Sequence, residues 1–186
     1  LLRSDAAAAA AAATSTPATA IIEERRVSGA PLPAALYADL LSALDTAKWP
    51  PLTHRRRVQS ERYLVVKAER MVSSASAGGA GAPGGGAVDP YARLKQACAA
   101  AMAWADPGFM YDHLAITRNF IGSPHMDTED KSHQYAVALG DYGEGGELVV
   151  EAEDGRTRWV VDTRGKMGRV DGRFVHWVRG YEFGGG

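Results

Sequence analysis

The hydrophobic positions in the first half of the chain repeat with the period of a helix. Such repeats occupy residues 33–49 and 90–104, and prolines follow both of them. Apolar side chains four positions apart lie on one face of an α-helix, and a proline soon afterwards marks the end of the helix. The sequence therefore predicts two amphipathic helices, whose apolar faces carry Leu36, Leu40 and Leu44 in the first and Leu94, Cys98 and Met102 in the second.

Beyond Gly108 the pattern changes to short runs that are rich in β-branched and aromatic residues. Gly, Asp and Pro separate these runs, as is typical of strands joined by turns. One more run of this kind lies between the helices, at 62–72. Helices followed by many short strands favour a mainly β fold (α+β), with a jelly-roll core and supporting N-terminal helices. The later strands are predicted at 111–120, 133–139, 147–152, 158–162 and 173–179.

Two stretches lack an apolar face. Residues 1–29 are Ala-rich and of low complexity, so they bury too little surface to offset chain entropy and are predicted to be disordered or a frayed helix. Residues 73–88 are mostly Ser, Gly and Ala, which predicts a flexible insertion. The rest, 30–186, is predicted to be a single domain. Because the chain stops at Gly186 in what looks like an unfinished strand, we expect that its C-terminal end is truncated.

Charge and cysteine content narrow the classes of function. The 21 Lys and Arg and 22 Asp and Glu leave a net charge of -1, so a nucleic-acid partner would need a local basic patch. The basic cluster at residues 54–57, His-Arg-Arg-Arg, is either such a patch or a charged loop. The single cysteine, Cys98, excludes an intrachain disulfide and a Cys-only zinc site. The longest apolar run, 6–13, is much shorter than the about 20 residues that span a bilayer. We expect an intracellular protein without a membrane partner.

The clearest chemical signal is the pair His125 and Asp127, with His176 further along the chain. On a strand, positions i and i+2 point to the same face, so His125 and Asp127 can reach one metal ion. A histidine from a distant strand would complete a 2-His-1-carboxylate set, which leaves open positions on an octahedral ion, as in non-heme Fe(II) oxygenases. We therefore predict that these three residues are metal ligands at a catalytic site. The alternative is that they are unrelated polar residues on a β-sandwich.

The neighbours of these residues form recognisable motifs: His125-Met126-Asp127, Gly145-Gly146-Glu147-Leu148 and Gly172-Arg173-Phe174-Val175-His176. With them, the segment from residue 111 to the end resembles the 2-oxoglutarate/Fe(II)-dependent dioxygenase superfamily. The resemblance implies a double-stranded β-helix and Fe(II) held by His125, Asp127 and His176. It also implies dioxygen and 2-oxoglutarate, or a related small co-substrate, as partners. By position, Asn119 would contact the keto acid.

A narrower resemblance concerns residues 118–127 together with Asp130 and the run that begins at His133. This part looks similar to an algal-type branch related to the ten-eleven-translocation and base-J-type enzymes, which oxidise methyl groups on DNA bases. The resemblance would make a modified nucleic-acid base the substrate. Asp130 is predicted either to face the site as a co-substrate-binding residue, where it would disfavour an anionic keto acid and favour a hydroxyl-bearing partner, or to be a solvated loop acid.

The resemblance is incomplete at one position. The superfamily usually fixes the far carboxylate of 2-oxoglutarate with an Arg or Lys on the strand after the second histidine, and this chain ends at Gly186 before such a residue. Arg179 is a poor substitute, because its odd offset from His176 predicts the opposite strand face.

We predict an Fe(II)-dependent dioxygenase that oxidises an organic substrate. The missing basic residue favours the alternative, a non-catalytic cupin-type jelly-roll module that binds a ligand without turnover.

Overall fold

The computed structural model describes residues 22–51, 60–68, 89–122 and 124–183. In these residues two helices and a larger number of strands form a mainly β chain, which confirms the coarse fold prediction. Three predictions lie outside the described residues: the nature of 1–21, the role of the basic cluster at 54–57, and the flexible insertion at 73–88.

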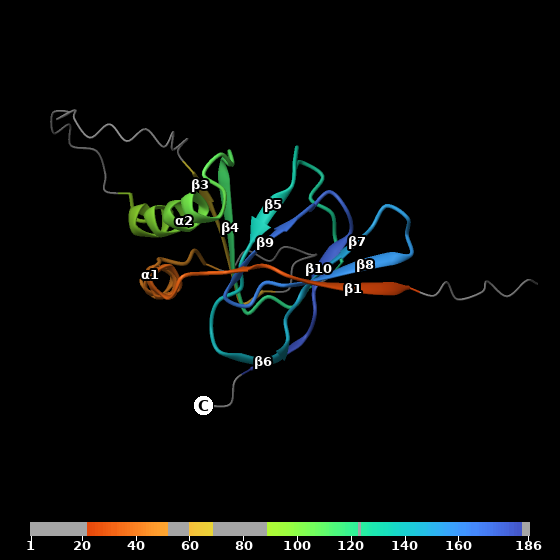
Figure 1. Cartoon of the computed structure of the whole chain (residues 1–186). Coiled ribbons are helices and arrows are strands. Elements are labelled where there is room, and N and C mark those ends of the chain that lie inside the picture. Colours follow the sequence, from red (N-terminus) through yellow and green to blue (C-terminus); the bar gives the residue numbers. More distant parts are fainter. Residues whose placement is uncertain (1–21, 52–59, 69–88, 123, 184–186) are drawn as a thin grey trace, which may run out of the picture.

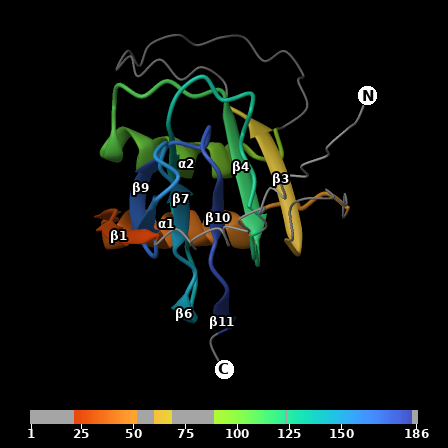
Figure 2. The ribbon, with the colours of Figure 1, turned by 90° about the vertical axis from the view of Figure 1, so that its right-hand side faces the viewer.

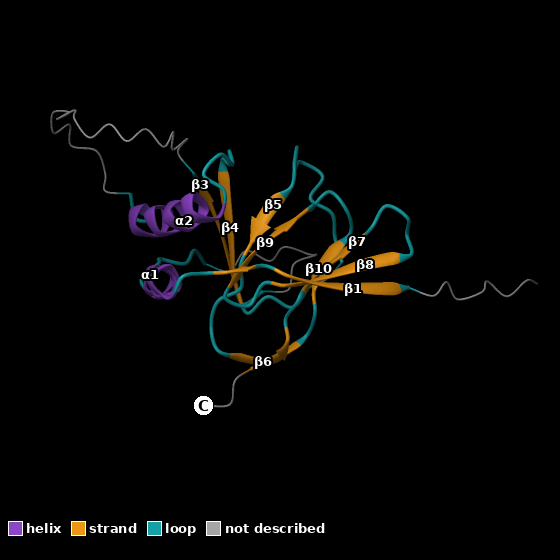
Figure 3. Cartoon of the chain, in the orientation of Figure 1, coloured by secondary structure: helices purple, strands orange, loops and turns teal. Residues whose placement is uncertain are grey.

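The helices occur where the four-residue repeat predicts them. Helix α1 spans Ala34–Asp45 and α2 spans Ala92–Ala105. They contact each other on one flank of the strands (Figures 1 and 3). Leu40 and Leu94 are buried where the two helices meet the sheet, in a core that includes Met167. Among the described residues, neither helix has the length and apolar character needed to cross a bilayer.

Strands β3 and β4 form an antiparallel pair next to the helices. Strand β3 spans Arg62–Lys67 and β4 spans His113–Arg118, and the two lie side by side in Figure 2. Leu64 of β3 is paired with Ile116 of β4. The side chains of β3 alternate, so that Leu64 and Val66 are buried in the core shared with α1 and α2, whereas Val65 is exposed. The pair therefore closes the helical core on its strand side.

A four-stranded sheet forms the other half of the molecule. Its order is β1-β8-β7-β10, with β7 antiparallel to both of its neighbours and β1 parallel to β8. One face packs Leu148, Val150 and Val161 against Val170 in a second core. The strand bounds are β1 Glu23–Ser28, β8 Thr157–Asp162, β7 Leu148–Glu151 and β10 His176–Val178.

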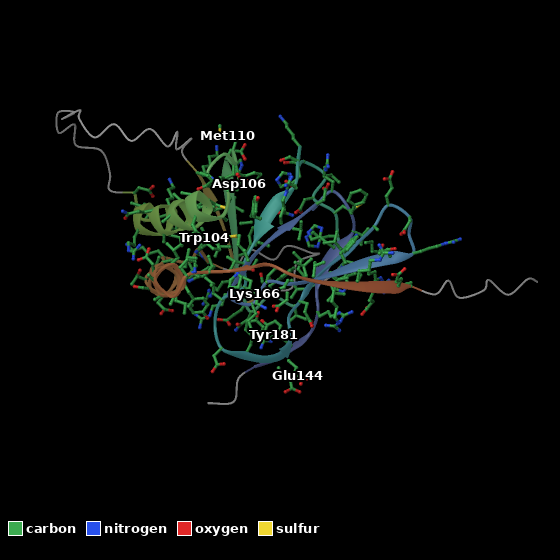
Figure 4. The ribbon with its side chains drawn as sticks, viewed as in Figure 1. Trp104, Asp106, Met110, Glu144, Lys166 and Tyr181 are labelled. Atoms are coloured by element: carbon green, nitrogen blue, oxygen red, sulfur yellow. The ribbon has the colours of Figure 1, made fainter. Side chains whose placement is uncertain are left out.

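Two smaller sheets complete the strand arrangement. In one, β9 is antiparallel to both β2 and β5, and Val170 of β9 lies against the four-stranded sheet. In the other, β6 pairs with β11 and projects away from the helices; Glu144 and Tyr181 mark this pair in Figure 4. The bounds are β2 Ala30–Pro31, β9 Lys166–Val170, β5 Gln134–Ala136, β6 Tyr142–Gly145 and β11 Tyr181–Phe183.

The structure corrects the strand prediction at several points, because β1, β2, β6 and β9 were not among the predicted strands. Residues 23–28, which we expected to be disordered or part of a frayed helix, form β1. All six residues are exposed, so the strand has no alternating hydrophobic pattern by which the sequence could predict it. It forms through main-chain pairing with β8. Strand β6 was also missed, because its glycines indicate a turn. Gly145 has a φ of +90°, and a Cβ there would lie 2.0 Å from the carbonyl oxygen of Gly180, so glycine is what allows β11 to approach.

Candidate metal centre

Main-chain hydrogen bonds bring the three predicted ligands together. His125 and His176 form an antiparallel bridge, in which each amide donates to the carbonyl oxygen of the other, at 3.1 and 2.8 Å. The amide of Asp127 donates to the carbonyl oxygen of Gly172 at 2.9 Å. The segment 125–127 therefore lies alongside the loop that leads into β10, and strand pairing places the distal histidine beside the first one.

The ligand atoms of His125, Asp127 and His176 all lie within 4.8 Å of one another. Nε2 of His125 is 3.8 Å from Oδ1 of Asp127, and Nε2 of His176 is 3.6 Å from Oδ2. Adjacent ligands on a six-coordinate ion with bonds of about 2.1 Å are about 3 Å apart. The two histidine–carboxylate separations exceed this value by less than 1 Å, so the three side chains could hold a single divalent ion.

The hydrogen bonding of His176 prepares it to act as a ligand. Its Nδ1 lies 2.9 Å from the carbonyl oxygen of Phe174, which can only accept, so Nδ1 carries the proton. In a neutral ring with this tautomer the lone pair is on Nε2, the nitrogen that faces Asp127. A main-chain carbonyl in this role is a common device for orienting a metal-binding histidine. His176 is buried at 6% exposure, which further restricts its ring.

Exposure differs among the three side chains. The side chain of Asp127 is 40% exposed, compared with 19% for His125 and 8% for His176. The centre is therefore closed on the side of β10 and open at Asp127. Such an arrangement would let a small molecule reach an ion at this centre while the histidines remain fixed.

Gln134 contacts the candidate centre through a hydrogen bond that the sequence did not predict. Its Nε2, on β5, donates to Oδ2 of Asp127 at 3.2 Å. Gly172 makes room for this contact, since a Cβ on Gly172 would lie 2.1 Å from Gln134 Nε2 and 3.2 Å from Asp127 Oδ2. Nothing in the local sequence distinguishes Gln134 from the other polar residues near it, because its role depends on the pairing of β5 with β9.

Asp130 lies close enough to the centre for the charges of Asp127 and His176 to shift the pKa of its carboxyl group. Its amide donates to the carbonyl oxygen of Asp127 at 3.2 Å. Burial raises the pKa of the Asp130 carboxyl, and the negative charge of Asp127 raises this pKa further, against a smaller opposing effect of His176. The predicted role of Asp130 in binding a co-substrate remains a prediction.

Asn119 has a different neighbour from the expected one. Its backbone is in the left-handed region, with a φ of +49°, and its Nδ2 donates to Oε2 of Glu61 at 2.6 Å. The amide is thus engaged by Glu61 on the exposed surface, and its contact with a keto acid remains a prediction. Arg179 pairs with Glu24 of β1. Gly186, the last residue before the expected Arg or Lys that would bind the far carboxylate of 2-oxoglutarate, lies outside the described residues.

Comparison of the chain with protein-family models, with curated proteins and with solved structures gives no match. The functional interpretation therefore depends on the geometry of the centre. What the structure itself supports is a possible metal-binding His-Asp-His set in a β-rich chain.

Proposed function

We propose that this chain is a non-heme Fe(II) oxygenase of the 2-oxoglutarate-dependent type. One observation carries the proposal: two histidines and one carboxylate, from segments far apart in the sequence, offer their ligand atoms within 4.8 Å of one another. A facial set of this composition occupies three positions of an octahedral ion and leaves three for small molecules. Fe(II) held by His125, Asp127 and His176 would supply the activation of dioxygen: one oxygen atom would be inserted into a C–H bond of the substrate, and the other would end in succinate as 2-oxoglutarate loses CO₂.

The residues of the chain contribute positioning. Through its carbonyl oxygen, Phe174 keeps the proton of His176 on Nδ1, so that Nε2 faces the ion. Gln134 restrains one carboxylate oxygen of Asp127, and the second oxygen stays near His125. Preorganised ligands lose less freedom on binding, so these contacts favour metal affinity.

The proposal includes a jelly-roll or double-stranded β-helix core. The arrangement of the second core supports it, because Val150 and Val161 of the four-stranded sheet face Ala136 and Val170 of the β2-β9-β5 sheet. Two sheets that pack their apolar faces together are the layers of such a fold. The parallel strand β1 extends one edge of the larger sheet.

Anaerobic titration with Fe(II), followed by 2-oxoglutarate, tests the proposal. We expect tight Fe(II) binding by calorimetry and a weak visible charge-transfer band when the keto acid chelates the ion. His125→Ala should abolish both. His113→Ala is the matched control, because His113 is exposed and bonded to Asp112 instead, with 2.9 Å between Nδ1 and Oδ1.

The possible results separate the candidate functions. Fe(II) binding with the visible band supports the oxygenase, and substrate screening would then include DNA with methylated bases. Fe(II) binding without the band argues against 2-oxoglutarate as co-substrate and leaves a metal-containing module of the cupin type. If the wild-type chain and His125→Ala both fail to bind Fe(II), the metal-centre proposal is wrong.

A further inference from the structure

One cross-strand row connects the metal centre with a tryptophan on the same sheet. His176 is opposite Val150, Val150 is opposite Trp159, and Trp159 is opposite Arg25. Side chains of directly paired residues share one face of a sheet. His176 and Trp159 are therefore on the same face, separated by two strand spacings, or about 10 Å.

A cavity of about 330 Å³ lies over this face, beyond Val150. Its size is at the lower end of clefts that bind small molecules, which begin at about 300 Å³. The loop after β9 forms one wall, and the same loop contacts the candidate metal centre through two main-chain carbonyl groups. The carbonyl oxygen of Phe174 accepts a hydrogen bond from Nδ1 of His176, and the carbonyl oxygen of Gly172 accepts one from the amide of Asp127. The apolar lining includes Val27, Val150, Trp159, Val161, Val170 and Phe174.

The charges around the cavity compensate one another. Asp171 pairs with Arg173 at 2.6 Å, and Glu151 pairs with Arg158 at 3.2 Å. The other two charged residues of the lining, Glu153 and Arg169, are of opposite sign. A charged ligand would therefore be desolvated without gaining a net opposite charge, which disfavours it relative to a neutral one.

Trp159 lines the cavity with a partly exposed indole ring. It is 37% exposed despite its position in an inner strand of the sheet, and the guanidinium of Arg25 lies 5.6 Å from its ring centroid. Indole rings attract other aromatic rings by stacking in addition to burial of apolar area. We propose that this cavity binds an uncharged aromatic ring of a small organic substrate. The lining of the cavity does not include His125, Asp127 or His176. As a substrate site of the oxygenase, the cavity would hold a part of the substrate that lies about 10 Å from the centre, and this assignment rests on the proposed function.

Calorimetry and saturation-transfer NMR can measure the binding of indole to the metal-free chain, which tests the cavity directly. We expect indole to bind better than cyclohexanol, which is uncharged but not aromatic, and better than benzoate, which is anionic. Trp159→Ala should weaken indole binding by about tenfold or more, and Trp159→Phe should restore most of it. Trp104→Ala is the matched control: Trp104 is 40% exposed but lies on α2, away from β8 (Figures 1 and 4).

A second variant guards against misfolding of Trp159→Ala. Val27 is 40% exposed on the edge strand β1 and lines the cavity, so Val27→Asp should leave the fold intact, add an uncompensated charge, and also weaken indole binding. With Mn(II) bound, indole protons about 10 Å away should relax faster, and His125→Ala should abolish this effect without loss of indole binding.

Three results would overturn the inference: no indole binding at millimolar concentration, equal binding by wild type and Trp159→Ala, or preference for benzoate. These results are independent of the Fe(II) and 2-oxoglutarate titration. A visible band without indole binding would refute the cavity assignment alone. Indole binding without Fe(II) binding would refute the oxygenase and keep the aromatic site.

Discussion

Gly172→Ala should weaken metal binding although residue 172 is not a ligand. A Cβ at this position would lie 2.1 Å from Nε2 of Gln134, whereas ordinary contacts begin at 3.4 Å. The amide must therefore retreat by about 1.3 Å or more, which breaks its 3.2 Å hydrogen bond to Asp127. Since the Gln134 amide is at the end of a flexible side chain, it can move without disruption of the backbone.

The size of the effect follows from the lost hydrogen bond. A hydrogen bond to a charged group contributes about 1.5–3 kcal/mol, and about 1.4 kcal/mol corresponds to a tenfold change in affinity. Loss of a partner that orients a metal ligand typically costs 10- to 100-fold in affinity. Asp127 is 40% exposed, so water replaces part of the interaction. We therefore expect the lower end of the range, about a tenfold increase in the Kd for Mn(II).

Isothermal titration with Mn(II), which is stable in air, measures this change. Gly108→Ala is the matched control, because a Cβ on Gly108 meets only Oδ1 of Asp106, at 3.7 Å. The sharper test is the double variant with Gln134→Ala. If Gly172→Ala acts through Gln134, it should cause no further loss in that background. An equal loss of affinity in both backgrounds would refute the reasoning, as would an unchanged Kd for Gly172→Ala.

Three further predictions concern stability and reactivity. Leu94→Ala should lower the free energy of unfolding by about 2–5 kcal/mol in urea titrations, because Leu94 is 2% exposed between the helices. Burial raises the pKa of the Cys98 thiol from 9.0 to about 11, so at pH 8 iodoacetamide should alkylate it roughly 100-fold more slowly than a free peptide thiol; equal rates would contradict this. The hydrogen bond from Arg173 lowers the pKa of Asp171 from 3.8 to about 2. The associated stability is present above pH 3.8 and is lost as the pH falls towards 2. Asp171→Asn should remove this part of the pH dependence of unfolding, and an unchanged acid profile would count against it.

Local patterns in the sequence determined the elements that contain their own periodicity. The four-residue repeats that include Leu40 and Leu94 predict α1 and α2 because an apolar stripe must be buried. The residue types His125, Asp127 and His176 likewise predict a metal-ligand set, since imidazole and carboxylate are ligands for divalent transition metals. Both inferences need only the identity and spacing of residues.

Contacts between distant segments were decided by the tertiary structure. Strand β1 has six exposed residues and forms through main-chain pairing with β8, which no hydrophobic pattern encodes. Gln134 reaches Asp127 because β5 pairs with β9 and Gly172 leaves room. The row from His176 to Trp159 exists only in the observed register, since a shift by one residue would turn every side chain to the other face. Strand register depends on the whole fold, so the sequence could name the ligands but not their surroundings.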